Sequence, residues 1–274
     1  MGADAGVARR TRLDSELVRR GMARSREQAA EFIGAGLVQV AGRPATKAAT
    51  QVDPGAPIVV RPAPNEPAYV SRGGHKLAAA LAHFGADGLR VTGRRCLDAG
   101  ASTGGFTDVL LREGAAHVVA VDVGYGQLAW SLRRDERVTV LERVNVRDLR
   151  PEQVGRPAEL VVADLSFISL TLVLPALVRC ATPDADHVLL VKPQFEAGKG
   201  RVGPGGVVRD PATRAEAIGR VAARAADLGL GACGVVASSL PGPAGNVEYF
   251  LWLRAGAPPL DPAETSRAVG EDPT

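Results

Sequence analysis

The stretch LDAGASTGGF, residues Leu97–Phe106, decides the fold of this chain. It has the pattern of a buried strand end, then a turn of small residues, then the first turn of a helix. A turn of this composition brings backbone N–H groups and a helix N-terminus close to a polar or anionic ligand. Two common designs are excluded. A dinucleotide fingerprint needs glycine where Ser102 stands, and no Gly-Lys-Ser/Thr of a P-loop follows.

Apolar strands and helical segments alternate on both sides of this turn. This pattern predicts a mostly parallel sheet with helices on both faces, a Rossmann-like α/β fold. Ligands bind such a sheet at the carboxyl ends of its strands. The predicted strands are 96–100, 117–122, 138–142, 159–167 and 187–192, with two closing strands at 233–239 and 247–254.

The N-terminal segment forms a separate small α+β pattern. A helix near Leu13–Val18 is followed by a second one with Ser25 as N-cap and Gln28 completing a capping box, and then by short strands. Residues 1–61 hold ten basic and six acidic residues, whereas the whole 274-residue chain has a net charge of only +3. A basic excess confined to one segment indicates contact with nucleic acid, although a merely soluble surface is an equal alternative.

Composition limits the remaining possibilities. Hydrophobic residues make up 46% of the chain and charged residues 23%, and no apolar run approaches a membrane span, so we expect a globular protein of the cytoplasm. The three cysteines and four histidines are scattered, so no metal site is predicted. The predicted domains are 1–61 and 73–255, joined by a proline-rich linker at 62–72 and followed by a disordered tail at 256–274.

The glycine turn resembles the S-adenosylmethionine (SAM) loop of class I methyltransferases. Asp122 ends the next strand, where a carboxylate can accept both ribose hydroxyls, although an ordinary strand-end cap is the alternative. Asn145 ends the third strand and is placed to read the adenine edge. The resemblance implies a cofactor site formed by Asp98, Gly100, Ser102, Gly104, Gly105, Phe106, Asp122 and Asn145.

Four charged residues fall at ends of predicted elements that share one edge of the sheet. Lys76, Asp164, Lys192 and Glu248 resemble the Lys-Asp-Lys-Glu tetrad of FtsJ-like ribose 2′-O-methyltransferases. A ribose hydroxyl is a weak nucleophile that must be oriented and lose its proton, and a lysine near other charges suits that task. The resemblance implies that Lys192 activates the hydroxyl, as a base or as a positioning cation, and that the other three position Lys192, substrate and cofactor.

Longer strings extend the resemblance to most of the chain. SRGGHKL, CLDAGASTGGFTDVLL, VVADLSFISL, LVKPQFE and PGPAGNVEYFLWL are similar to the TlyA family, and the N-terminal segment resembles an S4-like RNA-binding domain. The family methylates cytidine 2′-hydroxyls in large-subunit rRNA and, in its longer members, also in small-subunit rRNA, which is linked to capreomycin sensitivity. The N-terminal segment here resembles that of the longer members. Arg12, Arg26 and Lys47 match the family's rRNA-binding positions, and we expect a monomer.

One departure and two alternatives remain. Actinobacterial members of the family often carry Arg-X-Trp-Val in the linker, whereas Pro67 and Tyr69 stand at those places here, so an interdomain role of the arginine and tryptophan is in doubt. A pseudouridine synthase also carries an S4-like module but not this glycine loop. An RNA-binding non-enzyme or haemolysin-like protein is the other alternative. Phe195, beside Lys192, either stacks on the target base or packs in the interior.

Overall fold

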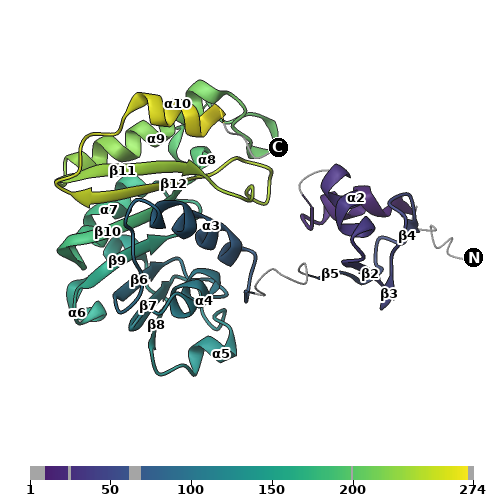
Figure 1. Ribbon diagram of the computed structural model, residues 1–274, viewed down its shortest axis with the longest axis horizontal. Helices are drawn as coiled ribbons and strands as arrows, with labels where there is room; N and C mark the ends of the chain where they lie inside the picture. The colour runs from purple at the N-terminus through teal and green to yellow at the C-terminus, as the bar shows by residue number, and fades with distance from the viewer. Residues whose placement is uncertain (1–9, 24–25, 62–68, 199, 271–274) are drawn as a thin grey trace, which may run out of the picture. The chain divides into compact units, whose positions relative to one another are not determined.

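The computed structural model describes residues 10–23, 26–61, 69–198 and 200–270 (Figure 1). The chain divides into two compact units, Met1–Ala68 and Tyr69–Thr274. The capping residue predicted at Ser25 and the linker position Pro67 lie outside the described residues.

The first unit packs two helices against short strands. Strand β1 pairs with β4, and β3, β2 and β5 form a separate three-stranded sheet in that order. Leu13, Leu17, Ile33 and Val38 are buried at its centre, which confirms a small α+β domain. Its elements are α1 (Leu13–Arg19), α2 (Arg26–Gly34), β1 (Thr11–Arg12), β2 (Val38–Val40), β3 (Arg43–Pro44), β4 (Gln51–Val52) and β5 (Ile58–Val60).

The second unit is built on one seven-stranded sheet with the order β11-β12-β10-β9-β6-β7-β8. The five strands from β10 to β8 are parallel, and β12 runs antiparallel between β10 and β11. This mostly parallel sheet confirms the predicted fold. The strands are β6 (Arg95–Ala99), β7 (His117–Asp122), β8 (Val138–Glu142), β9 (Ala158–Ala163), β10 (Ala181–Val191), β11 (Leu230–Ala237) and β12 (Tyr249–Ala255).

Helices cover both faces of this sheet (Figure 1). Because side chains alternate along a strand, Cys96 joins a core layer with residues of α3 and α4, while Leu97 joins a layer with residues of α7, α9 and α10. The helices are α3 (Gly73–Gly85), α4 (Gly105–Arg112), α5 (Trp130–Arg133), α6 (Pro151–Val154), α7 (Leu170–Arg179), α8 (Pro193–Glu196), α9 (Pro211–Ala226) and α10 (Pro262–Gly270), with 3-10 turns η1 (Val146–Asp148) and η2 (Pro204–Gly206).

The prediction of a disordered tail is wrong for residues 256–270. The Ala232 amide of β11 donates to the carbonyl of Pro258 at 2.8 Å, and Thr265, Ala268 and Val269 of α10 are buried. The tail is rich in proline, alanine and acids, as disordered segments are, but its few apolar residues share one helical face and find a partner in the sheet edge. Residues 271–274 lie outside the described part of the chain.

Candidate active site

Asp164 and Lys192 meet where two neighbouring parallel strands end. β9 ends at Ala163 and β10 at Val191, so both side chains stand one residue beyond the sheet. Lys192 Nζ lies 2.6 Å from Asp164 Oδ1, and it donates a hydrogen bond to Ser166 Oγ at 3.0 Å. The lysine side chain is only 10% exposed. The sequence therefore delivers a nearly buried lysine amino group to the carboxyl edge of the sheet.

Lys76 and Glu248 form a second buried pair. Lys76 Nζ donates to Glu248 Oε2 at 2.5 Å, and both side chains are almost fully buried. Lys76 lies in the first turns of α3, and Glu248 precedes β12 by one residue rather than lying inside the strand. A Cβ added at Gly242 would overlap Glu248 Oε1, so the backbone of the loop before β12 covers this carboxylate.

The two pairs lie at the same edge of the sheet. Val191 is paired with Tyr249, so the residues that follow β10 and precede β12, Lys192 and Glu248, occupy adjacent strand ends. The start of α3 also approaches Asp164, since a Cβ added at Gly73 would lie 4.0 Å from Asp164 Oδ2. The four charges predicted from the sequence therefore gather at one edge. With all four ionised their charges cancel, which offsets part of the cost of burying them.

The glycine turn lies beside this group and is fixed by its neighbours. Gly100 adopts a φ of +88°, and a Cβ at this position would overlap the carbonyl oxygen of Asp164. The Ser102 amide donates to Asp122 Oδ2 at 2.8 Å, and the Gly124 amide donates to Asp122 Oδ1 at 2.6 Å. Asp122 thus orders two loops. Each carboxylate oxygen has a second lone pair, so ribose hydroxyls can still be accepted there.

Asp98 is a fully buried carboxylate next to the turn. Thr107 Oγ1 donates to its Oδ2 at 2.7 Å, while Oδ1 has no hydrogen-bond partner among the described residues. Burial raises the pKa of Asp98 to about 7, and the nearby charges of Asp164 and Asp122 act in the same direction. A buried oxygen without a donor fits a site that is completed by a polar or cationic ligand, as SAM is.

The raised pKa of Asp98 predicts a pH-dependent stability. Above about pH 4 the Asp98 carboxyl group is still protonated in the folded chain but has lost its proton in the unfolded chain. The stability that this difference provides at low pH is lost as the pH rises through about 7. Between pH 5 and pH 8 this amounts to about 3 kcal/mol. The free energy of unfolding, measured by urea titration at both pH values, should therefore fall less in Asp98→Asn than in the wild type. Identical pH dependence in the two proteins would contradict this assignment.

The other residues predicted to bind the cofactor take different positions. Gly104 caps α4 with a φ of +100°, and Gly105 begins that helix. Phe106 is buried and its ring packs against Phe250 with centroids 6.0 Å apart, so its side chain belongs to the apolar core. Asn145 accepts a hydrogen bond from the amide of Arg147 at 3.0 Å, which caps η1. Its role in reading adenine stays a prediction.

The strand predicted at 159–167 is wrong beyond Ala163, where β9 ends and a loop begins. Phe167 is 91% exposed with a φ of +64°, and its ring lies 5.3 Å from that of Phe195, centroid to centroid. The end of the loop is held by Glu196, which accepts hydrogen bonds from Ser169 Oγ at 2.5 Å and from the Leu170 amide at 2.7 Å. A left-handed backbone conformation is unfavourable for phenylalanine. The contacts of the loop must therefore hold Phe167 in it.

The three predicted RNA contacts belong to the first unit. Arg12 and Arg26 both bind the carboxylate of Asp14, with shortest distances of 2.7 and 3.1 Å. Lys47 is exposed and precedes Ala48, whose carbonyl accepts the Asp14 amide at 3.1 Å. The structure thus brings Arg12 and Arg26 to one carboxylate near the start of α1, and places Lys47 next to the residue that bonds to the Asp14 amide.

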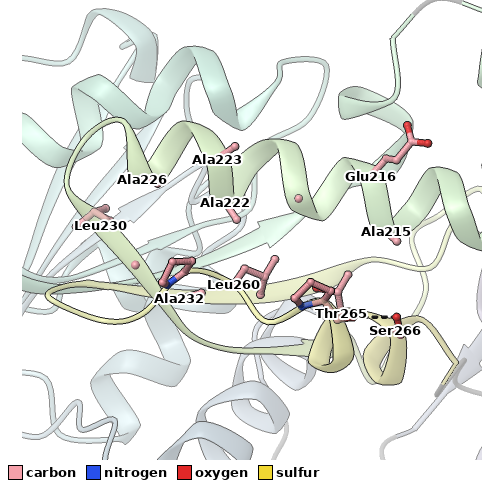
Figure 2. A pocket seen from close by; sticks show the side chains of 14 residues that line it. Ala215, Glu216, Ala222, Ala223, Ala226, Leu230, Ala232, Leu260, Thr265 and Ser266 are labelled. Atoms are coloured by element: carbon pink, nitrogen blue, oxygen red, sulfur yellow. Dashed lines mark hydrogen bonds between the residues drawn. The ribbon is translucent and has the colours of Figure 1, made fainter.

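An apolar pocket of about 480 Å³ lies elsewhere in the second unit, between α9, the start of β11, the loop before α10 and α10 itself (Figure 2). It contains none of the predicted site residues. Within the described ranges, no three His, Cys, Asp or Glu side chains are grouped so as to hold a metal ion. Across the same ranges, no helix has the length and apolarity needed to cross a membrane.

Two family models match the chain. The model of FtsJ-like methyltransferases matches residues 69–255, and the S4 domain model matches residues 11–58. These ranges agree with the two units of the structure.

Known proteins match over nearly the whole length. The chain is 62% identical to the 16S/23S rRNA (cytidine-2′-O)-methyltransferase TlyA of Mycobacterium tuberculosis, over 97% of this chain and all of that protein. It is 38% identical to Hemolysin A of Brachyspira hyodysenteriae over 87% of this chain and 98% of that one. A solved Streptococcus thermophilus structure matches with a TM-score of 0.77 and 38% identity over 96% of each chain. With its fold, its charged strand ends and these similarities, the chain belongs to the TlyA family of FtsJ-like methyltransferases.

Proposed function

We propose that the protein methylates the 2′-hydroxyl of cytidines in ribosomal RNA, in the large subunit and also in the small subunit, with SAM as methyl donor. The observation that carries the proposal is the pair of buried ion pairs, Lys192–Asp164 and Lys76–Glu248, at the strand ends beside the glycine turn. The relative with 62% identity, named for both 16S and 23S rRNA, supports the choice of substrate. As an rRNA enzyme it would act in the cytoplasm as a monomer.

The chain's own groups suit the cofactor. Asp122 would hold the ribose, Asp98 and the Gly100 turn the methionine part, and Asn145 the adenine. When bound, SAM supplies a methyl group on a sulfonium sulfur, which keeps the C–S electron pair as the methyl leaves. The carbonyl of Asp164 packs against Gly100, so the tetrad and the turn are one assembly.

Lys192 would act on the target hydroxyl. The 2′-oxygen must form a new bond to carbon and give up its proton, and a group within hydrogen-bonding distance must orient it and take that proton. Lys192 as a neutral amine would accept the proton itself. As an ammonium ion it would instead orient the hydroxyl, and the proton would pass to solvent. Asp164 and Ser166 hold the Nζ atom in place for either role.

Phe167 and Phe195 would support the target nucleotide. Base stacking on an exposed aromatic ring needs no particular sequence and is worth about 1–3 kcal/mol per base. The two rings lie next to each other, on the loop that carries Ser166 and on the turn that follows Lys192. This arrangement favours the stacking interpretation of Phe195 over simple packing.

The test is direct mapping of the product. Purified protein is incubated with separated bacterial ribosomal subunits and methyl-labelled SAM, and 2′-O-methyl positions are mapped in each rRNA. We expect label on cytidine ribose in both subunits. Label on a base, or uridine isomerisation without transfer of label, would refute the proposal. Loss of these methyl groups should also reduce sensitivity to capreomycin, as the family resemblance implies.

Reversing the charge of the predicted RNA contacts should weaken RNA binding by the first unit without changing SAM binding by the second. The triple variant Arg12→Glu, Arg26→Glu and Lys47→Glu removes three phosphate contacts, so affinity for ribosomal subunits should fall by about 100-fold or more at moderate salt. Affinity for SAM, measured by calorimetry, should not change. Arg224→Glu, on α9 of the other unit, makes the same kind of change and should leave RNA binding intact. Loss of SAM binding in the triple variant would defeat the assignment.

A further inference from the structure

A buried carboxylate lies among the basic residues of the first unit. Asp14, in the first turn of α1, is 3% exposed. Arg12 binds it with both Nε and Nη2, at 3.0 and 2.7 Å, and Arg26 Nη2 binds the same carboxylate at 3.1 Å. The Ser15 amide donates a further hydrogen bond at 2.7 Å. The Arg12 guanidinium holds the pKa of Asp14 well below its usual range, so the carboxylate stays charged.

Both guanidinium groups keep a solvent-facing side. The Arg12 side chain is 42% exposed and the Arg26 side chain 56% exposed, although each uses two of its donors on Asp14. A guanidinium has five N–H donors in a planar fork, so the outer donors stay available to a phosphate. The backbone bond from Asp14 to Ala48 places the Lys47 segment at the same location.

We propose that Asp14 is a positioning residue for RNA, which holds the Arg12 and Arg26 forks in the orientation that phosphate oxygens require. The inference rests on the proposed rRNA substrate and adds a residue that itself touches no RNA. An exposed arginine loses rotamer freedom when it binds, and prior fixation on Asp14 lowers that cost. On charge alone, an anionic group in a phosphate-binding surface would weaken binding. When the Asp14 carboxylate is neutralised, loss of the fixed arginine orientation should weaken RNA binding, whereas loss of the negative charge alone should strengthen it.

The test is Asp14→Asn in the full-length protein, with affinity for isolated bacterial ribosomal subunits measured by filter binding. Asparagine has the same shape but presents an N–H₂ group to one guanidinium. We expect affinity to fall about tenfold although the net charge becomes more positive, since one charge-assisted hydrogen bond is worth about that factor. Glu31→Gln, an exposed acid on α2, changes the charge equally and should not weaken binding. Equal or tighter binding by Asp14→Asn would overturn the inference.

A double-mutant cycle shows whether Asp14 acts through the arginines. In a background with Arg12→Ala and Arg26→Ala, Asp14→Asn should have no further effect on RNA affinity; a further tenfold loss would indicate a merely structural role and overturn the proposal. If Asp14→Asn lowers the melting temperature too far for binding to be measured, Arg12→Lys is used in its place. This variant keeps the positive charge but loses the planar pair of donors that binds Asp14, so affinity should still fall about tenfold. Unchanged affinity would contradict the proposal. Failure of the wild type to bind subunits would instead refute the proposed substrate.

Discussion

Lys192→Ala is expected to lower the rate of methyl transfer to ribosomal RNA by about 1,000-fold or more, because a positioned acid–base group contributes roughly 100- to 10,000-fold. Lys192 is the tetrad member whose Nζ contacts both Asp164 and Ser166. Its removal also leaves Asp164 without its cation. Single-turnover kinetics with methyl-labelled SAM and the preferred ribosomal subunit measure the effect. The KM for RNA should change little, because the predicted phosphate contacts lie in the S4 domain and not at Lys192.

A graded control identifies the source of the effect. Ser166→Ala removes only the neutral partner of Lys192, so the rate should fall by about tenfold at most. SAM affinity should be unchanged in both variants, since neither side chain belongs to the glycine turn. A pH–rate profile then distinguishes the two roles of Lys192. A rate that rises with pH through one ionisation, and loses that dependence in Lys192→Ala, assigns Lys192 as the base. Full activity of Lys192→Ala would remove it from the mechanism.

The sheet and the catalytic edge were predictable because their signals are local. Most parallel strands are apolar runs that end in a polar residue, so Asp122 and Lys192 could be placed at one edge of the sheet from the sequence. Asp164 was placed there too, but the strand predicted at 159–167 ran past it, whereas β9 ends at Ala163. Parallel strand ends must share an edge, and this geometry requires no knowledge of packing. The positions of Lys76 and Glu248 needed the family resemblance, since neither residue lies inside a strand of the parallel part of the sheet.

Features that depend on tertiary contacts were not predictable. Asp14 binds Arg26 twelve positions away, and Thr107 binds Asp98 nine positions away, and no periodicity in the sequence marks either pair. The left-handed conformation of Phe167 is likewise set by its neighbours, because an isolated phenylalanine avoids it. The tail was misjudged for the same reason, since its composition resembles that of disorder until a sheet edge supplies a partner.

Gly100→Ala is expected to weaken SAM binding more than any single change in a polar residue of the predicted cofactor site. With a φ of +88°, alanine is strained there, at a cost of about 1 kcal/mol. Its Cβ would also overlap the Asp164 carbonyl oxygen, which is backbone and cannot rotate away. Either the turn or the end of β9 must shift, which costs a further 1–3 kcal/mol, roughly. Such a shift would move the amides predicted to hold the cofactor together with the tetrad, so SAM affinity should fall by about 100-fold or more.

Gly229→Ala separates strain from overlap. Gly229 follows α9 with a φ of +83°, nearly the same as Gly100, but no neighbouring atom lies within 4 Å of a Cβ built there. This variant should lose only the roughly 1 kcal/mol of strain in a urea titration and keep wild-type SAM affinity in calorimetry. If Gly100→Ala also bound SAM normally, the turn would not be the cofactor site. If both variants lost SAM binding equally, backbone strain and not contact with Asp164 would be responsible, and the coupling of turn and tetrad would be wrong.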